Sequence, residues 1–208
     1  MPVFLAISRI IDKFNTYLGR GAAMLIMVAI VVSAGNAVVR KLVDTSSNAW
    51  LEMQWMLFGA VFLLCAPWTL LINEHIRVDI LSSNLEPRKK LWIDVFGHLA
   101  FLLPFCIVII ATSIPFAVES YRLGEQSSSA GGLTQWPAKF LIPIGFCALL
   151  LQSVSELIKR AAALRGDLDE ALVTGSANDP AEEAERLLRD AGIQQNDSDP
   201  QNGRGDAR

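Results

Sequence analysis

Four stretches of the chain are almost entirely apolar and are separated by polar segments. They cover residues 21–39, 51–72, 91–117 and 140–157. At roughly 18 to 27 residues each, and 1.5 Å per residue in a helix, every stretch is long enough to cross a ~30 Å hydrocarbon core. Membrane strands are about half as long and alternate in polarity. The pattern therefore predicts an all-α integral membrane protein with four transmembrane helices.

The third stretch is the least regular of the four. It carries Asp94 and His98 near its start, and Pro104 and Pro115 further along. A proline inside a helix removes one backbone hydrogen bond and bends or breaks the helix. We expect this span to begin late, tilt or kink.

An amphipathic helix is predicted over residues 1–20, ahead of the first span. Apolar residues recur there at spacings of three and four, with polar residues between them: Phe4, Ile7, Ile11, Phe14 and Leu18. Its basic residues favour a cytoplasmic segment lying in the membrane interface. The alternative is a plain extension of the first span. Gly19 and Gly21 offer a bend between the two pieces.

Composition supports the membrane prediction. Hydrophobic residues make up 52% of the 208 residues, and the mean hydropathy of +0.37 is high for a soluble domain. All five tryptophans fall close to a predicted helix end, where an amphipathic ring suits the water–lipid boundary: Trp50, Trp55, Trp68, Trp92 and Trp136.

Basic residues set the expected orientation, because cytoplasmic loops of membrane proteins are enriched in them. One side of the predicted membrane carries Arg9, Lys13, Arg20, Arg77, Arg88, Lys89, Lys90, Lys159, Arg160 and Arg165, and the other carries only Arg40, Lys41, Arg122 and Lys139. Both termini and the middle loop should therefore be cytoplasmic. The first span is longer than the 7–15 residue core of a usual signal peptide, so we expect it to be retained.

The chain changes character after the four-span domain, which we place at residues 21–165. Residues 166–208 are acidic and polar, with few apolar residues, and this predicts a mostly disordered cytoplasmic tail. Within it, Asp179, Pro180 and Glu182 resemble the capped start of a short helix that would run through Leu187 and Leu188 to Gly192.

Catalytic, metal and cofactor motifs are not apparent. The chain has two histidines, too few for the usual metal sites, and no phosphate loop, nucleophile elbow or HExxH motif. Cys65, Cys106 and Cys147 lie inside spans and are expected to pack as small hydrophobes. The basic residues flank helices, which indicates topology and lipid contact rather than nucleic-acid binding. We therefore predict neither an enzyme nor a cofactor-binding protein.

Ionisable residues near the spans are interpreted as local anchors. Glu52 opens the second span, and Asp94 and His98 are spaced to pair across one helical turn. At the other end of the second span, Arg77 can pair with Glu74 or Asp79 and fix how the chain leaves the membrane.

Small residues repeat at four-residue intervals in the first span, at Ala29, Ser33 and Ala37, and permit close helix contact. A bundle without a catalytic site favours a role as a subunit.

These residues carry a family resemblance over about residues 5 to 165. The chain resembles the small membrane subunit of tripartite ATP-independent periplasmic (TRAP) transporters, the DctQ type. The matching features are Trp50 and Glu52, the string His75 to Asp79, and Pro143 to Phe146, with an outer loop that contains Tyr121, Glu125, Ser127 and Pro137. The acidic tail departs from the family pattern.

The resemblance implies a scaffold subunit in the bacterial cytoplasmic membrane. Its partners would be a large permease subunit of the DctM type and a periplasmic substrate-binding protein of the DctP type, which together import an organic acid or a similar solute with sodium. Residues that match the family pattern would then position subunits rather than bind substrate: Trp50, Glu52, His75, Arg77, Asp79, Glu125, Ser127 and Pro137. The alternative is a self-associating membrane anchor or assembly protein.

Overall fold

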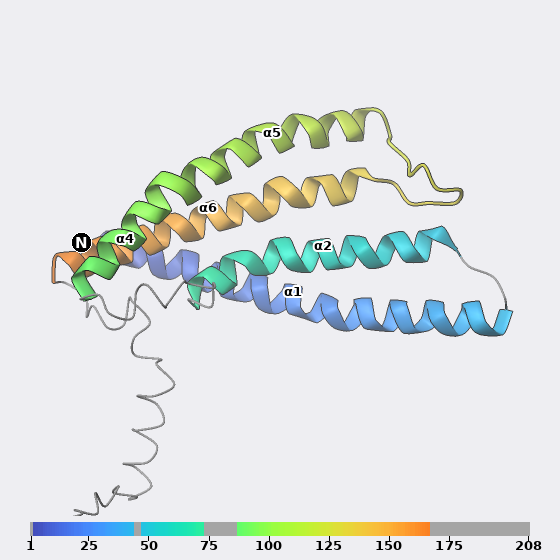
Figure 1. The fold of residues 1–208 in the computed structure, drawn as a ribbon, viewed down its shortest axis with the longest axis horizontal. Coiled ribbons are helices and arrows are strands. Elements are labelled where there is room, and N and C mark those ends of the chain that lie inside the picture. The colour runs from blue at the N-terminus through green and yellow to red at the C-terminus, as the bar shows by residue number, and fades with distance from the viewer. Residues whose placement is uncertain (1, 44–46, 73–86, 167–208) are drawn as a thin grey trace, which may run out of the picture.

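The computed structural model describes residues 2–43, 47–72 and 87–166, and this part of the chain is helical apart from its turns and one loop (Figure 1). The elements are α1 (Pro2–Val43), α2 (Asn48–Leu71), α4 (Pro87–Gly97), the π-helical turn η1 (His98–Leu102), α5 (Leu103–Arg122) and α6 (Trp136–Leu164). Four helices are long and apolar enough to span a membrane. The predicted four-helix architecture is confirmed. The string His75 to Asp79 and the acidic tail lie outside the described residues.

The long helices form an open row rather than a closed bundle. Figure 1 shows α5, α6, α2 and α1 in that order, fanning out from the end where the N-terminus lies. Helix α2 packs between α1 and α6, and among the long helices described here α5 packs mainly on α6. Helix α6 also reaches α1 where the row converges. The outward faces of the described helices therefore expose many large apolar side chains.

Helix α1 is one continuous helix, without the bend expected at Gly19 and Gly21. The structure thus follows the alternative in which residues 1–20 extend the first span. Gly19 serves close packing instead, because a Cβ built there would lie 2.5 Å from the Cβ of Trp68. The thiol of Cys65 also donates to the Gly19 carbonyl at 3.6 Å.

In residues 2–20, part of the polar side of the helix packs against the rest of the protein, and much of the apolar side is exposed. Ser8 and Asn15 are buried against α6, while Phe4 and Phe14 are more than half exposed. The side of this segment that carries Ser8 and Asn15 therefore faces the protein interior, while its basic residues are exposed.

The third span contains a π-helical turn, whereas the tilt or kink expected from its sequence stays a prediction. The Leu103 N–H donates to the His98 carbonyl, which is the five-residue spacing of a π-helical turn. Pro104 follows directly and has no N–H, so the regular hydrogen-bond ladder is interrupted at this point. The π-turn offsets the register between α4 and α5.

Close contact between α2 and α6 depends on Gly145. A Cβ at this position would meet the Leu63 carbonyl oxygen at 2.9 Å, a backbone atom that has little freedom to move. The first-span stripe of small residues is only partly used, because Ala29 is fully buried whereas Ala37 is exposed. Close approach of the helices is therefore required at Gly19 and Gly145, and Ala22 and Ala29 of α1 are buried as well.

Candidate functional site

A cluster of buried polar side chains lies where the row converges, and we call it the polar core. It comprises Ser8, Asp12 and Asn15 of α1, Asp94 of α4, and Gln152, Ser155, Glu156, Lys159 and Arg160 of α6. On α1 and on α6 these residues recur at spacings of three and four, so those on each helix share one face. The polar core joins α1, α4 and α6 side by side.

Hydrogen bonds between α1 and α6 run through Gln152. Its amide nitrogen donates to Asp12 Oδ1 at 2.9 Å and to Glu156 Oε1 at 3.1 Å, and its oxygen accepts from Asn15 Nδ2 at 2.8 Å. Ser155 Oγ adds a 2.7 Å bond to Asp12 Oδ1. Because Asn15 and Gln152 are fully buried, these bonds replace water that neither side chain can reach.

Arg160 is the residue of the polar core whose burial is most costly, since its charged side chain is fully buried. Its Nη1 donates to Glu156 Oε2 at 2.5 Å, and its Nε donates to Asp94 Oδ2 at 3.3 Å. Lys159 pairs with Glu156 and with Asp12. A buried charge is tolerated only when it is paired in this way.

The expected side-chain pair between Asp94 and His98 is not what the structure contains. His98 Nδ1 lies 2.8 Å from the backbone carbonyl oxygen of Asp94, and the Asp94 carboxylate reaches Arg160 on another helix. The guanidinium competes successfully for the carboxylate because an ionised donor makes the stronger hydrogen bond.

A second arrangement, the loop anchor, lies at the opposite end of the row and centres on Glu52. One carboxylate oxygen accepts from Ser127 Oγ, and the other accepts from the Leu133 N–H at 2.6 Å. Gly132 is required beside it, because a Cβ there would lie 2.7 Å from Glu52 Oε1. The loop between α5 and α6 is thus fastened to the first turns of α2.

The same loop is fastened a second time through Glu125. Its carboxylate pairs with Lys139 of α6, whose Nζ also lies 4.1 Å from the centre of the Phe116 ring. A T-shaped contact between Tyr121 and Trp136, with ring centroids 5.3 Å apart, joins the two helix ends. The Gln135 N–H donates to the Glu125 carbonyl and closes the loop at its base.

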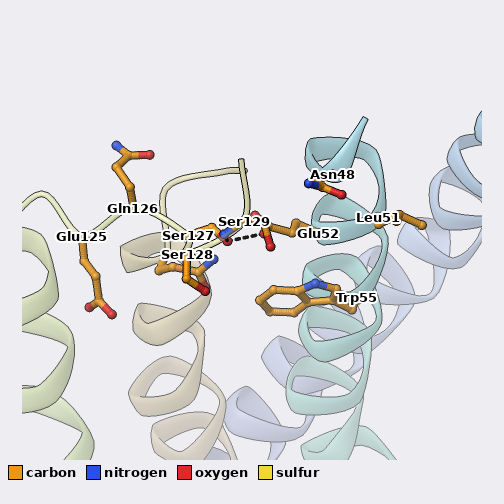
Figure 2. A pocket seen from close by; sticks show the side chains of 10 residues that line it. Asn48, Leu51, Glu52, Trp55, Glu125, Gln126, Ser127, Ser128 and Ser129 are labelled. Atoms are coloured by element: carbon orange, nitrogen blue, oxygen red, sulfur yellow. Dashed lines mark hydrogen bonds between the residues drawn. The ribbon is translucent and has the colours of Figure 1, made fainter. Parts of the chain in front are cut away.

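A polar pocket of about 550 Å³ opens beside the loop anchor (Figure 2). Trp55 forms one wall, and Asn48 stands on the rim, where its amide nitrogen donates to the Ala130 carbonyl at 3.0 Å. Glu125 and Gln126 lie on the loop side. The two carboxylates at this pocket, those of Glu52 and Glu125, are hydrogen-bonded to other groups of the chain. We therefore interpret the pocket as a surface for contact with another protein rather than as a ligand site.

The Glu125 interaction has a predictable pH dependence. Hydrogen bonding from Lys139 holds the pKa of Glu125 below its ordinary value of 4.5. A lowered pKa in the folded state means that this contribution to stability is complete above that value and is lost as the pH falls through the lower folded pKa. Exchange of the Gln135 amide, corrected for intrinsic rates, should therefore show constant protection from pH 8 to about 5. Loss of protection within that range would contradict the assignment, and Glu125→Gln provides the non-titrating control.

The structure brings together part of the predicted site. Glu52 and Ser127 are in direct contact and Glu125 lies beside them. Trp50 is exposed on the first turn of α2, and Pro137 lies in the first turn of α6, where its missing N–H costs no helical hydrogen bond. His75, Arg77 and Asp79 lie outside the described residues.

The polar core was not among the predicted site residues. The available signal was Gln152, Ser155 and Glu156, which lie within or at the end of an apolar span at helical spacing. Ser8, Asp12 and Asn15 recur in the same way on α1, in the segment predicted to be an amphipathic helix. No group of three metal-ligating side chains occurs in the described part of the chain.

Comparison with known families gives one clear finding. The family model described as "Tripartite ATP-independent periplasmic transporters, DctQ component" matches residues 21–163. No curated protein and no solved structure matches the chain significantly. The matched range includes α2, α5, the loop anchor and most of α6, and it begins within α1.

Proposed function

Because the chain belongs to the DctQ family of tripartite ATP-independent periplasmic transporters, we propose that it is the scaffold subunit of a sodium-coupled importer of an organic acid or similar solute. Its partners in this proposal are a large DctM-type permease subunit and a periplasmic DctP-type binding protein. The complex would lie in the bacterial cytoplasmic membrane, with both termini of this chain in the cytoplasm.

The open row of helices is the observation that supports this proposal most directly. Three of the four candidate spans are each only 17% buried over their most apolar window, compared with 39% for α6. Helices that make few contacts within their own chain have faces free for another membrane protein, and packing between complementary helix faces drives association in lipid. The described helices thus resemble one layer of a larger assembly.

The two polar arrangements fit a fixed subunit. In both, the charged side chains are held by partners from different helices, and a rearrangement would break several of these bonds at once. We infer that Glu52, Glu125 and Ser127 position the outer surface, and that Trp50 and Pro137 lie at its edge. His75, Arg77 and Asp79 remain predicted positioning residues at the other end of α2.

Assembly provides the direct test. Mild extraction of the tagged full chain from its native host should recover a larger polytopic membrane protein in constant ratio. Vesicles that contain the pair and the binding protein should take up solute only when a sodium gradient is present. Recovery of a stable homo-oligomer without a larger partner would favour the alternative, a self-associating anchor. Uptake that is indifferent to sodium would remove the coupling ion from the proposal.

Topology can be tested independently. Reporter fusions after Arg165 and within residues 77–90 should report the cytoplasm, since these segments carry most of the basic residues. Fusions near Asp44 and Ser128 should report the opposite side. A reversal at any one position would be incompatible with four spans and two cytoplasmic termini.

A further inference from the structure

The segment of α1 that precedes Gly19 extends well past the end of α2. Gly19 lies level with Trp68, three residues before α2 ends at Leu71. About 14 residues of α1 therefore continue beyond that end, a distance of roughly 20 Å. Helix α2, at 24 residues, is by itself long enough to cross the hydrocarbon core. The extension is thus expected outside the hydrocarbon, in agreement with the charged polar core beneath it.

An apolar stripe runs along the outer side of this extension. Its members alternate at spacings of four and three, and each is exposed: Val3 67%, Ile7 44%, Ile10 70%, Phe14 54% and Tyr17 64%. This spacing is the seam by which one helix packs on another. An apolar seam outside the hydrocarbon is costly to leave in water, so it needs a covering partner.

Charge beside the stripe defines the partner. Arg9, Lys13 and Arg20 are exposed and follow the stripe along one edge. In paired helices, residues at such flanking positions select a partner of opposite charge. The stripe therefore fits a short amphipathic helix with acidic residues beside its apolar side.

The chain itself supplies such a segment. Between Pro180 and Gly192, apolar residues recur at spacings of three, four and three, at Ala181, Ala184, Leu188 and Ala191. Glu185 lies directly beside these positions, and Glu182 and Glu183 add acidic charge further round the same helix; Arg186, Arg189 and Asp190 follow. We propose that residues 180–192 form a helix that docks on the outer stripe of α1.

The connection is long enough for this docking. Helix α6 ends at Leu164, and Ser155 of that helix lies 2.7 Å from Ser8 of α1, so the tail starts at the same end of the molecule. Residues 167–179 can extend to about 45 Å. The stripe from Val3 to Tyr17 is only about 21 Å long. Every position on it is within reach of the tail.

Cysteine cross-linking of the full chain tests the docking. In a variant without Cys65, Cys106 and Cys147, the pair Ile10→Cys and Leu188→Cys should link within one chain in phosphatidylcholine nanodiscs. The matched control is Phe96→Cys with Leu188→Cys, because Phe96 of α4 is 63% exposed at the same end. The first pair should link at least about fivefold more efficiently.

A charge swap makes the test specific. Changing Glu182, Glu183 and Glu185 to Lys should lower the yield about fivefold to tenfold, since each exposed ion pair contributes modestly. Changing Arg9, Lys13 and Arg20 to Glu in the same chain should restore it. Equal yields in both cysteine pairs would overturn the proposal. So would links only between two chains, or quenching of a fluorophore at Ile10→Cys by brominated lipid, which would assign the stripe to a second copy or to the bilayer.

Discussion

Replacing Arg160 by alanine is expected to lower the free energy of unfolding by about 3–5 kcal/mol, because it breaks a buried ion pair and leaves its acidic partners without their strongest donor. Glu156 is 2% exposed and Arg160 is fully buried, so water cannot replace the lost bonds. The Asp94 link between α4 and α6 is lost with them. The midpoint of thermal unfolding in detergent should fall by roughly 10 °C.

Two further variants sharpen this experiment. Arg165→Ala removes a basic residue one turn later that is exposed, and it should change the midpoint by little. Arg160→Lys keeps the charge but lacks the planar fork that reaches two carboxylates, so it should give an intermediate loss. An Arg160→Ala chain as stable as the parent would mean that the polar core contributes little net stability.

Replacing Glu52 by alanine is expected to release the loop between α5 and α6. The Leu133 N–H and the Ser127 hydroxyl lose their shared acceptor at once, and the Leu133 N–H is then left without its acceptor in the protein. Exchange of the Leu133 amide should accelerate about 10- to 100-fold, while α6 amides near Gly145 keep their protection. Hydrogen exchange with fragment analysis measures both regions in the same sample.

Controls distinguish the hydrogen bonds of Glu52 from its charge. Glu119→Ala removes an exposed carboxylate close to the same loop and should leave Leu133 unchanged. Glu52→Gln retains one acceptor oxygen and should show an intermediate rate. If Leu133 exchanged equally fast in the parent and in Glu52→Ala, Glu52 would not be the residue that holds the loop.

The two polar arrangements differed in how far they could be predicted. Glu52 and Ser127 were selected from the chain because they lie beside a span and match a family pattern, although no spacing rule indicated that they touch across 75 residues. From the sequence, Arg160 was interpreted only as one of the basic residues that indicate which side of the membrane is cytoplasmic. Its burial depends on the packing of α4 and α6, and a basic residue near a helix end carries no mark of that packing.

The sequence alone predicts four spans, because crossing a membrane requires a long run of apolar residues and such runs are visible in the sequence. Pro104 made some irregularity in the third span predictable, since a proline has no N–H wherever the chain folds, but only the structure shows that it is a π-turn. Which side of a helix meets which neighbour was decided only by the tertiary structure. In lipid, apolar side chains suit both the interior and the outside, so their periodicity does not identify the buried face. The side of α1 that carries Asp12 and Asn15 faces inward because Gln152, Ser155 and Lys159 of α6 hydrogen-bond to it.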